Sequence, residues 1–134
     1  MATQPFDWSE YHSLAQELVK QSGESYLRTA VSRAYYYVFH LARQRLIDNR
    51  FIILEKQDSH KQVWEKFIAS PDHRCRKLAE TGKRLKEKRE TADYEPHFPK
   101  IEKDAQAMVA LAAQFASELS HLDANLPRNT GVLR

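Results

Sequence analysis

Residues that interrupt helices are scarce in this sequence, which has 3 glycines and 5 prolines among 134 residues. Runs of β-branched residues are also few, so the composition favours an all-α fold. One cysteine, Cys75, excludes an internal disulfide and favours a reducing, cytoplasmic location. The apolar stretch without a charge at residues 34–42 is too short to span a bilayer. We therefore expect a soluble protein without a membrane segment.

Motifs for metal binding and for common nucleotide chemistry are absent as well. The six histidines form no His-x-x-x-His pair and no cluster with Cys75. The chain has no glycine-rich phosphate loop and no Gly-x-Ser-x-Gly nucleophile motif. These absences predict a protein that uses neither a metal ion nor a cofactor.

The length predicts a single domain over residues 1–134, with its core in about 8–122 and a tail over 123–134. We expect helices at about 7–21, 24–49, 59–69, 72–94 and 100–123, with residues 51–54 forming either an extended segment or the end of the second helix. Apolar residues alternate steps of four and three along the last helix, the pattern of a helix that packs on a partner. These residues are Ile101, Ala105, Met108, Ala112, Phe115, Leu119 and Leu122. The architecture expected is an antiparallel bundle of four to five helices.

The second of these helices is apolar around most of its circumference and is the best candidate for the centre of the core. Leu27, Val31, Ala34, Val38 and Leu41 form one apolar stripe along it.

Two polar residues interrupt this helix. Arg33 and His40 are two turns apart, so they project from nearly the same side. The simplest interpretation pairs Arg33 with a carboxylate and hydrogen-bonds His40 to a carbonyl. The other interpretation makes them functional.

The fourth helix is strongly basic. Between His73 and Arg89 lie eight lysines or arginines and two glutamates, a balance of +6 on a chain whose net charge is +3. This pattern is typical either of a solvated surface or of a footprint for a nucleic-acid backbone. The candidate nucleic-acid-binding residues are Arg76, Lys77, Lys83, Arg84, Lys86 and Lys88.

The last turns of the basic helix carry further polar residues. Arg89 and Asp93 are four residues apart and are able to pair with each other. Alternatively, Asp93 pairs with Arg33 across the bundle, which leaves Arg89 free to meet a phosphate. The helix period does not decide between these two pairings.

Three motifs, taken in order and spacing, resemble the HEPN family, and the resemblance covers about residues 8–122. The motifs are Ser32-Arg33-Ala34-Tyr35-Tyr36 with Phe39-His40, then Ser59-His60-Lys61, then Arg89-Glu90-Thr91-Ala92-Asp93-Tyr94. The resemblance implies an all-α bundle that forms a homodimer and works in toxin–antitoxin or antiviral systems, often beside a small nucleotidyltransferase. It also implies metal-independent cleavage of RNA by an Arg-x(4–6)-His motif.

The chain departs from that motif at one position. Tyr94 occupies the place where an Arg-x(4)-His motif that begins at Arg89 would have its histidine. Arg33 and His40 do have the required spacing, with six residues between them, but they lie on an earlier helix.

We hypothesise that Arg33 and Arg89 hold a phosphate of RNA or of a nucleotide. In this hypothesis His40 transfers the proton, and Asp93 and Tyr94 orient these groups. His60 is a second candidate for the base. One alternative is a non-catalytic subunit that pairs with a nucleotidyltransferase or another protein. Another is general nucleic-acid binding through the basic helix.

Overall fold

Five α-helices and a short 3-10 helix build the computed structural model, which describes residues 4–133. In chain order they are α1 (Ser9–Leu18), α2 (Glu24–Asp48), α3 (Ser59–Ile68), α4 (His73–Tyr94), α5 (Ile101–His121) and η1 (Thr130–Leu133). Residues 4–133 contain no strand, so the all-α prediction is confirmed. None of these helices combines the length and apolar character needed to cross a membrane.

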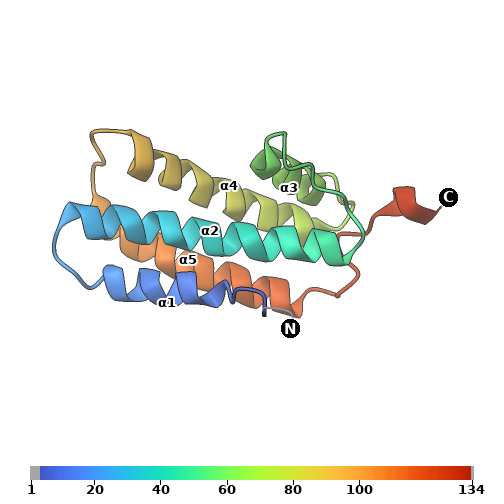
Figure 1. Ribbon diagram of the computed structural model, residues 1–134, viewed down its shortest axis with the longest axis horizontal. Coiled ribbons are helices and arrows are strands. Elements are labelled where there is room, and N and C mark those ends of the chain that lie inside the picture. The colour runs from blue at the N-terminus through green and yellow to red at the C-terminus, as the bar shows by residue number, and fades with distance from the viewer. Residues whose placement is uncertain (1–3, 134) are drawn as a thin grey trace.

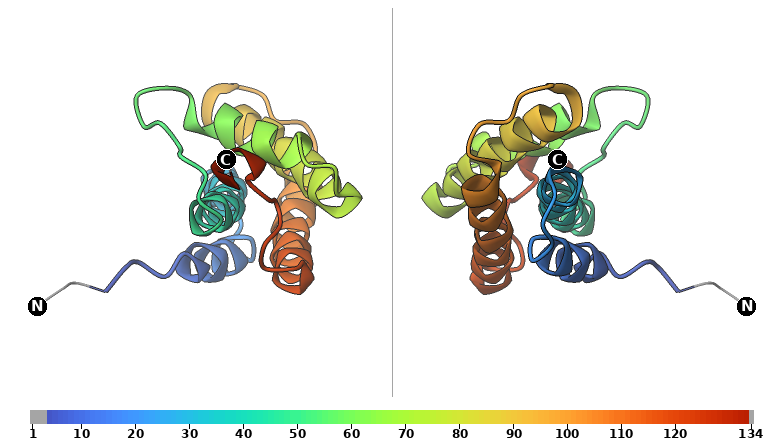
Figure 2. Two further views of the ribbon diagram at one scale, coloured as in Figure 1. Left: turned by 90° about the vertical axis from the view of Figure 1, so that its right-hand side faces the viewer. Right: turned by 90° about the vertical axis from the view of Figure 1, so that its left-hand side faces the viewer.

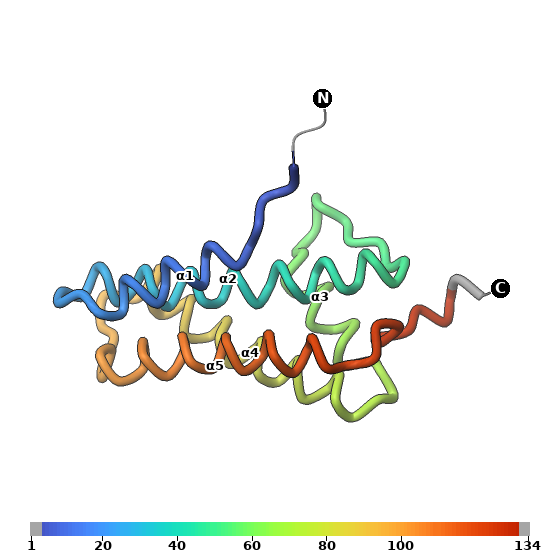
Figure 3. The backbone as a smooth tube through the Cα atoms, turned by 90° about the horizontal axis from the view of Figure 1, so that it is seen from below, coloured from blue at the N-terminus to red at the C-terminus, as the bar shows by residue number. Residues whose placement is uncertain are grey.

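α2 contacts every other α-helix and occupies the centre of the bundle (Figure 1). α1 and α4 run antiparallel to α2, and α5 runs antiparallel to α4. Viewed from below, α1 lies beside α2 and α5 lies beside α4 (Figure 3). The short α3 crosses over α4 at one end of the bundle (Figure 2). The predicted antiparallel bundle is therefore confirmed.

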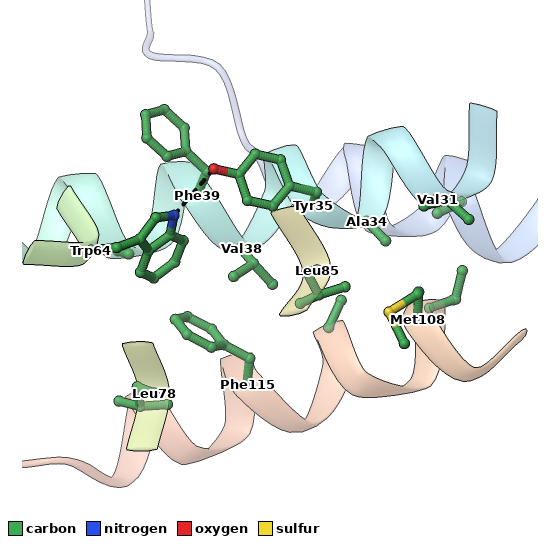
Figure 4. Packing of buried hydrophobic residues seen from close by; sticks show 14 of the residues in the cluster. Val31, Ala34, Tyr35, Val38, Phe39, Trp64, Leu78, Leu85, Met108 and Phe115 are labelled. Atoms are coloured by element: carbon green, nitrogen blue, oxygen red, sulfur yellow. Dashed lines mark hydrogen bonds between the residues drawn. The ribbon is translucent and has the colours of Figure 1, made fainter. Parts of the chain in front are cut away.

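Apolar side chains of α2, α4 and α5 meet in the core. Val31, Ala34 and Val38 are fully buried, and Phe115 of α5 lies opposite α2 (Figure 4). All seven positions of the apolar pattern of α5 are buried, as predicted. Leu41, the last residue of the predicted stripe of α2, is only half-buried and packs against the core.

The end of the first helix differs from the prediction. α1 ends at Leu18 rather than near Gln21. Gly23 precedes α2 as its N-cap, with φ of 124° and ψ of 133°. That region of φ and ψ is open mainly to glycine, which explains why glycine is suited to this position. Asp58 and Asp72 cap α3 and α4 by accepting backbone hydrogen bonds.

Residues 51–58 form a non-helical connection between α2 and α3, which settles the alternative left open by the sequence. Arg50 adopts a positive φ of 71° directly after α2. The side-chain amide of Gln62 then exchanges two hydrogen bonds of 2.9 Å with the backbone of Leu54. The connection is thereby held against α3.

Two arginines of α2 bind the ends of other helices. The guanidinium of Arg28 donates to carbonyl oxygens at the C-terminal end of α4, at 2.6–3.4 Å. Arg45 does the same at the C-terminal end of α5 and in the segment after it, at 2.7–3.1 Å. Each arginine satisfies carbonyl groups that a helix end leaves without intrahelical partners.

The segment after α5 is part of the packed structure rather than a free tail. Pro127 is fully buried, and its carbonyl accepts a hydrogen bond of 3.1 Å from Asn49. Asn129 donates to the carbonyl of Arg50 at 2.9 Å. These contacts hold residues 123–129 against the end of α2.

Candidate functional site

Arginines and histidines from three helices surround the ring of Tyr36. The guanidinium carbons of Arg33 and Arg89 lie 5.1 and 5.3 Å from its centre. The imidazoles of His60 and His40 have their centres 5.8 and 6.3 Å away. We call these five residues the Tyr36 cluster. The negative face of an aromatic ring favours neighbouring cations, so Tyr36 partly offsets the repulsion between the two arginines.

Arg89 is the most deeply placed charge of the cluster. Its side chain retains 9% of its exposure, and its Nη1 lies 3.6 Å from Asp93 Oδ2, longer than a hydrogen bond. Nε is fully buried and has no hydrogen-bond partner among residues 4–133. A buried donor without a partner costs about 1–3 kcal/mol, and more when it is charged. Arg89 is therefore held in place by packing, with its hydrogen-bonding capacity largely unused.

Arg33 has no carboxylate within 4.0 Å in the described part of the chain, so the interpretation that pairs it with one is wrong. Its Nη2 donates to Ser32 Oγ at 3.4 Å, and Ser32 Oγ donates to Asp93 Oδ2 at 3.4 Å. The guanidinium also lies 4.6 Å from the ring centre of Tyr11. Of the two pairings that the sequence leaves open, the structure has the local one, between Arg89 and Asp93.

His40 is stacked on an indole ring rather than hydrogen-bonded to a carbonyl. Its ring centre lies 3.4 Å from that of Trp8, with the two planes 5° apart. Burial, followed by the charges of Arg43, His60 and Arg33, lowers the pKa of His40 from 6.5 to about 4. The imidazole is thus neutral at neutral pH, and the expected carbonyl bond is not formed within residues 4–133.

His60 belongs to a buried hydrogen-bond chain. Trp64 Nε1 donates to the hydroxyl of Tyr35 at 3.1 Å (Figure 4). Among residues 4–133, His60 Nδ1 at 2.6 Å is the one acceptor for the Tyr35 proton, so we assign the donor role to Tyr35. The ring proton of His60 is then on Nε2. Burial, followed by the charges of Arg89 and Lys86, lowers the pKa of His60 and favours this neutral form.

Tyr94 lies at the edge of the cluster. Its side chain is 74% exposed, and its ring centre is 6.0 Å from the guanidinium of Arg89. In residues 4–133 no hydrogen bond connects Tyr94 to the other site residues, so an orienting role finds no support in the geometry.

The six basic residues expected to bind nucleic acid have different surroundings. Lys88 forms an ion pair of 2.9 Å with Asp104 of α5, whereas Lys86 lies toward α3, where its charge acts on His60. Arg76 donates to two backbone carbonyls that precede α4. Lys77, Lys83 and Arg84 are exposed. Of these six residues, Lys86 is therefore the one whose charge acts on the Tyr36 cluster, through His60.

Sequence reasoning missed the aromatic residues that complete the site. Trp8 and Tyr11, which are not among the predicted site residues, are half-buried and contact His40 and Arg33. The available signal was the short turn between two antiparallel helices, which brings residues equally far from the turn together. Tyr11 and Arg33, seven and nine residues from the helix ends at this turn, come close to satisfying that relation. Trp8 and His40, at ten and sixteen residues, do not.

Comparisons of the chain with protein-family models, with curated proteins and with solved structures found no match. Residues 4–133 contain no group of three or more histidine, cysteine or acidic side chains arranged to hold a metal ion.

Proposed function

We propose that the Tyr36 cluster binds a phosphate group of RNA or of a nucleotide. The observation that carries this proposal is Arg89, a buried guanidinium with an unpartnered Nε and only a loose ion pair. Guanidinium presents a planar set of donors that matches the oxygens of a phosphate. A phosphate beside Arg89 would make charge-assisted hydrogen bonds that the protein itself does not provide.

Neighbouring groups favour a phosphate over a singly charged carboxylate. Arg33 supplies a second guanidinium beside the same Tyr36 ring, and His60 presents an Nε2–H donor. Two cations and a neutral donor suit a ligand with several acceptor oxygens and more than one partner. Asp93 supplies the only carboxylate within 4.0 Å of these guanidiniums in residues 4–133.

The HEPN resemblance supports the same proposal. Arg33, His60 and Arg89 come one from each of the three motifs, and they meet around Tyr36. A HEPN-type protein would use this meeting point for its nucleic-acid chemistry.

Metal-independent cleavage of RNA is an extension of this proposal. The ribose 2′-oxygen would attack the adjacent phosphorus, and His40 would accept the 2′-hydroxyl proton because its ring is neutral. Arg33 and Arg89 would stabilise the charge that develops on the phosphate oxygens. The bond to the 5′-oxygen breaks, and that oxygen takes a proton from water. The hydroxide that remains takes the proton held by His40. The products are a 2′,3′-cyclic phosphate and a 5′-hydroxyl.

The experiment that tests binding is titration of labelled RNA with the full chain at one fixed salt concentration. Arg33→Ala and Arg89→Ala should each weaken binding by about tenfold or more. Arg84→Ala is the matched control, because Arg84 is an exposed arginine on α4 outside the cluster. Equal effects of all three variants would refute the site and favour general binding through the basic helix.

Cleavage is tested separately with labelled RNA in excess EDTA. Wild type should release cyclic-phosphate ends, and His40→Ala and Arg89→Ala should not. If wild type binds RNA and leaves it intact, the cluster is a binding site without the cleavage activity.

A second candidate function is that of a non-catalytic interaction subunit, as a homodimer or with a nucleotidyltransferase. It is favoured by apolar side chains near the end of α2 and around α3: Ile47, Ile52, Leu54 and Ile68 are 37%, 77%, 49% and 39% exposed. Sedimentation of wild type and Ile52→Ser at several concentrations tests self-association through this surface. If wild type and Ile52→Ser are both monomeric at every concentration, the homodimer is excluded from this candidate function.

A further inference from the structure

Four aromatic rings surround the imidazole of His40, and two of them come from the start of the chain. Phe39 and Tyr36, which lie beside His40 on α2, have ring centres 5.2 and 6.3 Å from that of the imidazole. Tyr11 and Trp8 approach from α1 and its N-cap, at 6.5 and 3.4 Å. Because the indole of Trp8 is parallel to the imidazole within 5°, it covers one face of His40.

Phe6 and Tyr11 hold the indole in this position. Their ring centres lie 4.9 and 5.3 Å from that of Trp8 and 5.4 Å from each other. Tyr11 is in turn anchored on Arg33, whose guanidinium lies 4.6 Å from its ring centre. We call Phe6, Trp8 and Tyr11 the N-terminal aromatic cluster. It attaches the start of the chain to His40 and Arg33, two members of the Tyr36 cluster.

Residues 4–8 have few other attachments. Asp7 accepts hydrogen bonds of 3.0 and 2.7 Å from the backbone and the hydroxyl of Ser9, at the start of α1. In the described part of the chain, no hydrogen bond joins residues 4–8 to α2, α3, α4 or α5. Phe6 is 47% exposed, and the segment that carries it projects from the side of the bundle (Figure 2). A terminal segment that is held by a few ring contacts opens at a low cost in free energy.

The chemistry proposed for His40 requires a ribose hydroxyl beside its imidazole. Of the four rings around that imidazole, only the ring of Trp8 belongs to the weakly attached segment. Movement of residues 4–8 would therefore uncover His40 while α1 and α2 stay packed on each other. A protein whose binding-competent form is only partly populated binds its ligand with an affinity that is reduced by that fraction.

We propose that residues 4–8 are an autoinhibitory lid, which closes the Tyr36 cluster by stacking Trp8 on His40 and opens when the ligand binds. In the open form the indole leaves the imidazole, and the ribose beside the bound phosphate takes its place. This inference rests on the proposed phosphate site and adds the regulation of access to it. One aromatic pair contributes about 2- to 12-fold to an equilibrium constant. Removal of the indole should therefore raise both the accessibility of His40 and the affinity for the ligand by factors of about this size.

The first test needs no ligand and measures how fast diethyl pyrocarbonate modifies His40, with the modified peptides identified by mass spectrometry. The full chain is used at mildly alkaline pH, where an imidazole is neutral whether the lid is closed or open. The exposed His73 on α4 serves as the internal reference. Relative to wild type, the rate at His40 should rise about 2- to 12-fold in Trp8→Ala. It should rise by a smaller factor in Phe6→Ala, which loosens the lid and leaves the indole in place.

Leu14→Ala is the matched control, since Leu14 is an apolar residue of α1 that is 44% exposed and lies outside the aromatic cluster. It should react as wild type does. Equal rates at His40 in wild type and Trp8→Ala would overturn the lid. The same increase in Leu14→Ala as in Trp8→Ala would also overturn it, because loosening of α1 would then explain the result.

The second test adds RNA and follows the lid by tryptophan fluorescence. Trp8 and Trp64 are the two tryptophans of the chain, and Trp64 is 1% exposed, so quenching by acrylamide reports mainly on Trp8. Saturating RNA should increase this quenching in wild type, and Trp8→Ala should bind labelled RNA about 2- to 12-fold more tightly than wild type.

The outcomes separate the lid from the phosphate site. If Arg33→Ala weakens RNA binding but RNA leaves the quenching of Trp8 unchanged, the phosphate site stands and the lid fails. Weaker RNA binding by Trp8→Ala would also overturn the lid, because the indole would then support the ligand rather than exclude it. If Arg33→Ala and Arg89→Ala leave RNA binding unchanged while Trp8→Ala exposes His40 to diethyl pyrocarbonate, the lid stands and the phosphate site fails.

Discussion

Gly82 offers a stringent test of the packing beneath the site. It lies in α4 against the six-membered ring of Trp64, whose side chain is 1% exposed. A Cβ at position 82 would lie 2.6 Å from Cζ2 of Trp64 and closer still to Cη2 and Cζ3. The indole cannot remain where it is, and its movement would break the hydrogen bond to Tyr35 that orients His60.

Two opposing effects determine the expected magnitude of Gly82→Ala. Alanine favours the interior of a helix over glycine by about 1 kcal/mol. Overpacking costs about 1–3 kcal/mol, and loss of the hydrogen bond between Trp64 and Tyr35 costs about 1 kcal/mol more. We therefore expect a net loss of about 1–3 kcal/mol in the free energy of unfolding.

Urea denaturation of four proteins tests this reasoning: wild type, Gly82→Ala, Trp64→Phe and the double variant. A phenyl ring is shorter than indole and leaves room for the methyl group. In the Trp64→Phe background, Gly82→Ala should thus be neutral or stabilising by up to about 1 kcal/mol. A stabilising effect of Gly82→Ala in the wild-type background would refute the close packing of Gly82 on Trp64.

Three further predictions concern charged and titratable groups. Because the folded state lowers the pKa of His40 to about 4, the unfolded chain binds more protons between about pH 4 and 6.5, so stability should fall as the pH falls through this window. After allowance for screening at a half-buried ring, we expect the free energy of unfolding to fall by about 1 kcal/mol at about pH 5. The urea midpoint should be lower there than at neutral pH, and the decrease should be smaller in His40→Gln. An unchanged midpoint would contradict the burial of His40. Asp93→Asn removes the carboxylate that competes with phosphate for Arg89. The affinity for RNA, measured by titration, should therefore rise several-fold. A decrease would assign Asp93 to ligand binding. Arg45→Met removes three hydrogen bonds to carbonyl groups and should cost about 2–4 kcal/mol, measured as a lower Tm in thermal unfolding; an unchanged Tm would contradict the capping role.

Features that depend on the period of a single helix were predictable from the sequence. The seven apolar positions of α5 are all buried because steps of three and four return to the same side of a helix. The same argument placed Arg33 and His40 on one side of α2, and both lie close to Tyr36 and Tyr11.

Features that depend on contacts between helices were not predictable in the same way. The stacking of His40 on Trp8 depends on the position of α1 relative to α2. The hydrophobic period of a single helix does not give that position. The helix period leaves open whether Asp93 pairs with Arg89 or with Arg33. Only the packed structure shows that Asp93 lies beside Arg89 and that Arg33 contacts aromatic rings and Ser32. The end of α1 at Leu18 was not predictable either, because the next glycine, Gly23, is the N-cap of α2 and does not mark that end.

Arg28 and Arg45 of α2 bind the ends of α4 and α5, so the length of α2 between them is tied to the positions of those two helix ends. Arg28 and Arg45 are 17 residues apart, which is about 26 Å along a helix. Since α4 and α5 are antiparallel, their C-terminal ends lie at opposite ends of this interval. Adding or removing a helical turn between Arg28 and Arg45 would detach one of the two caps unless α4 or α5 changed with it. Length variation between related sequences is therefore expected in residues 51–58 and 95–100, and an unchanged spacing of the two arginines is expected in α2.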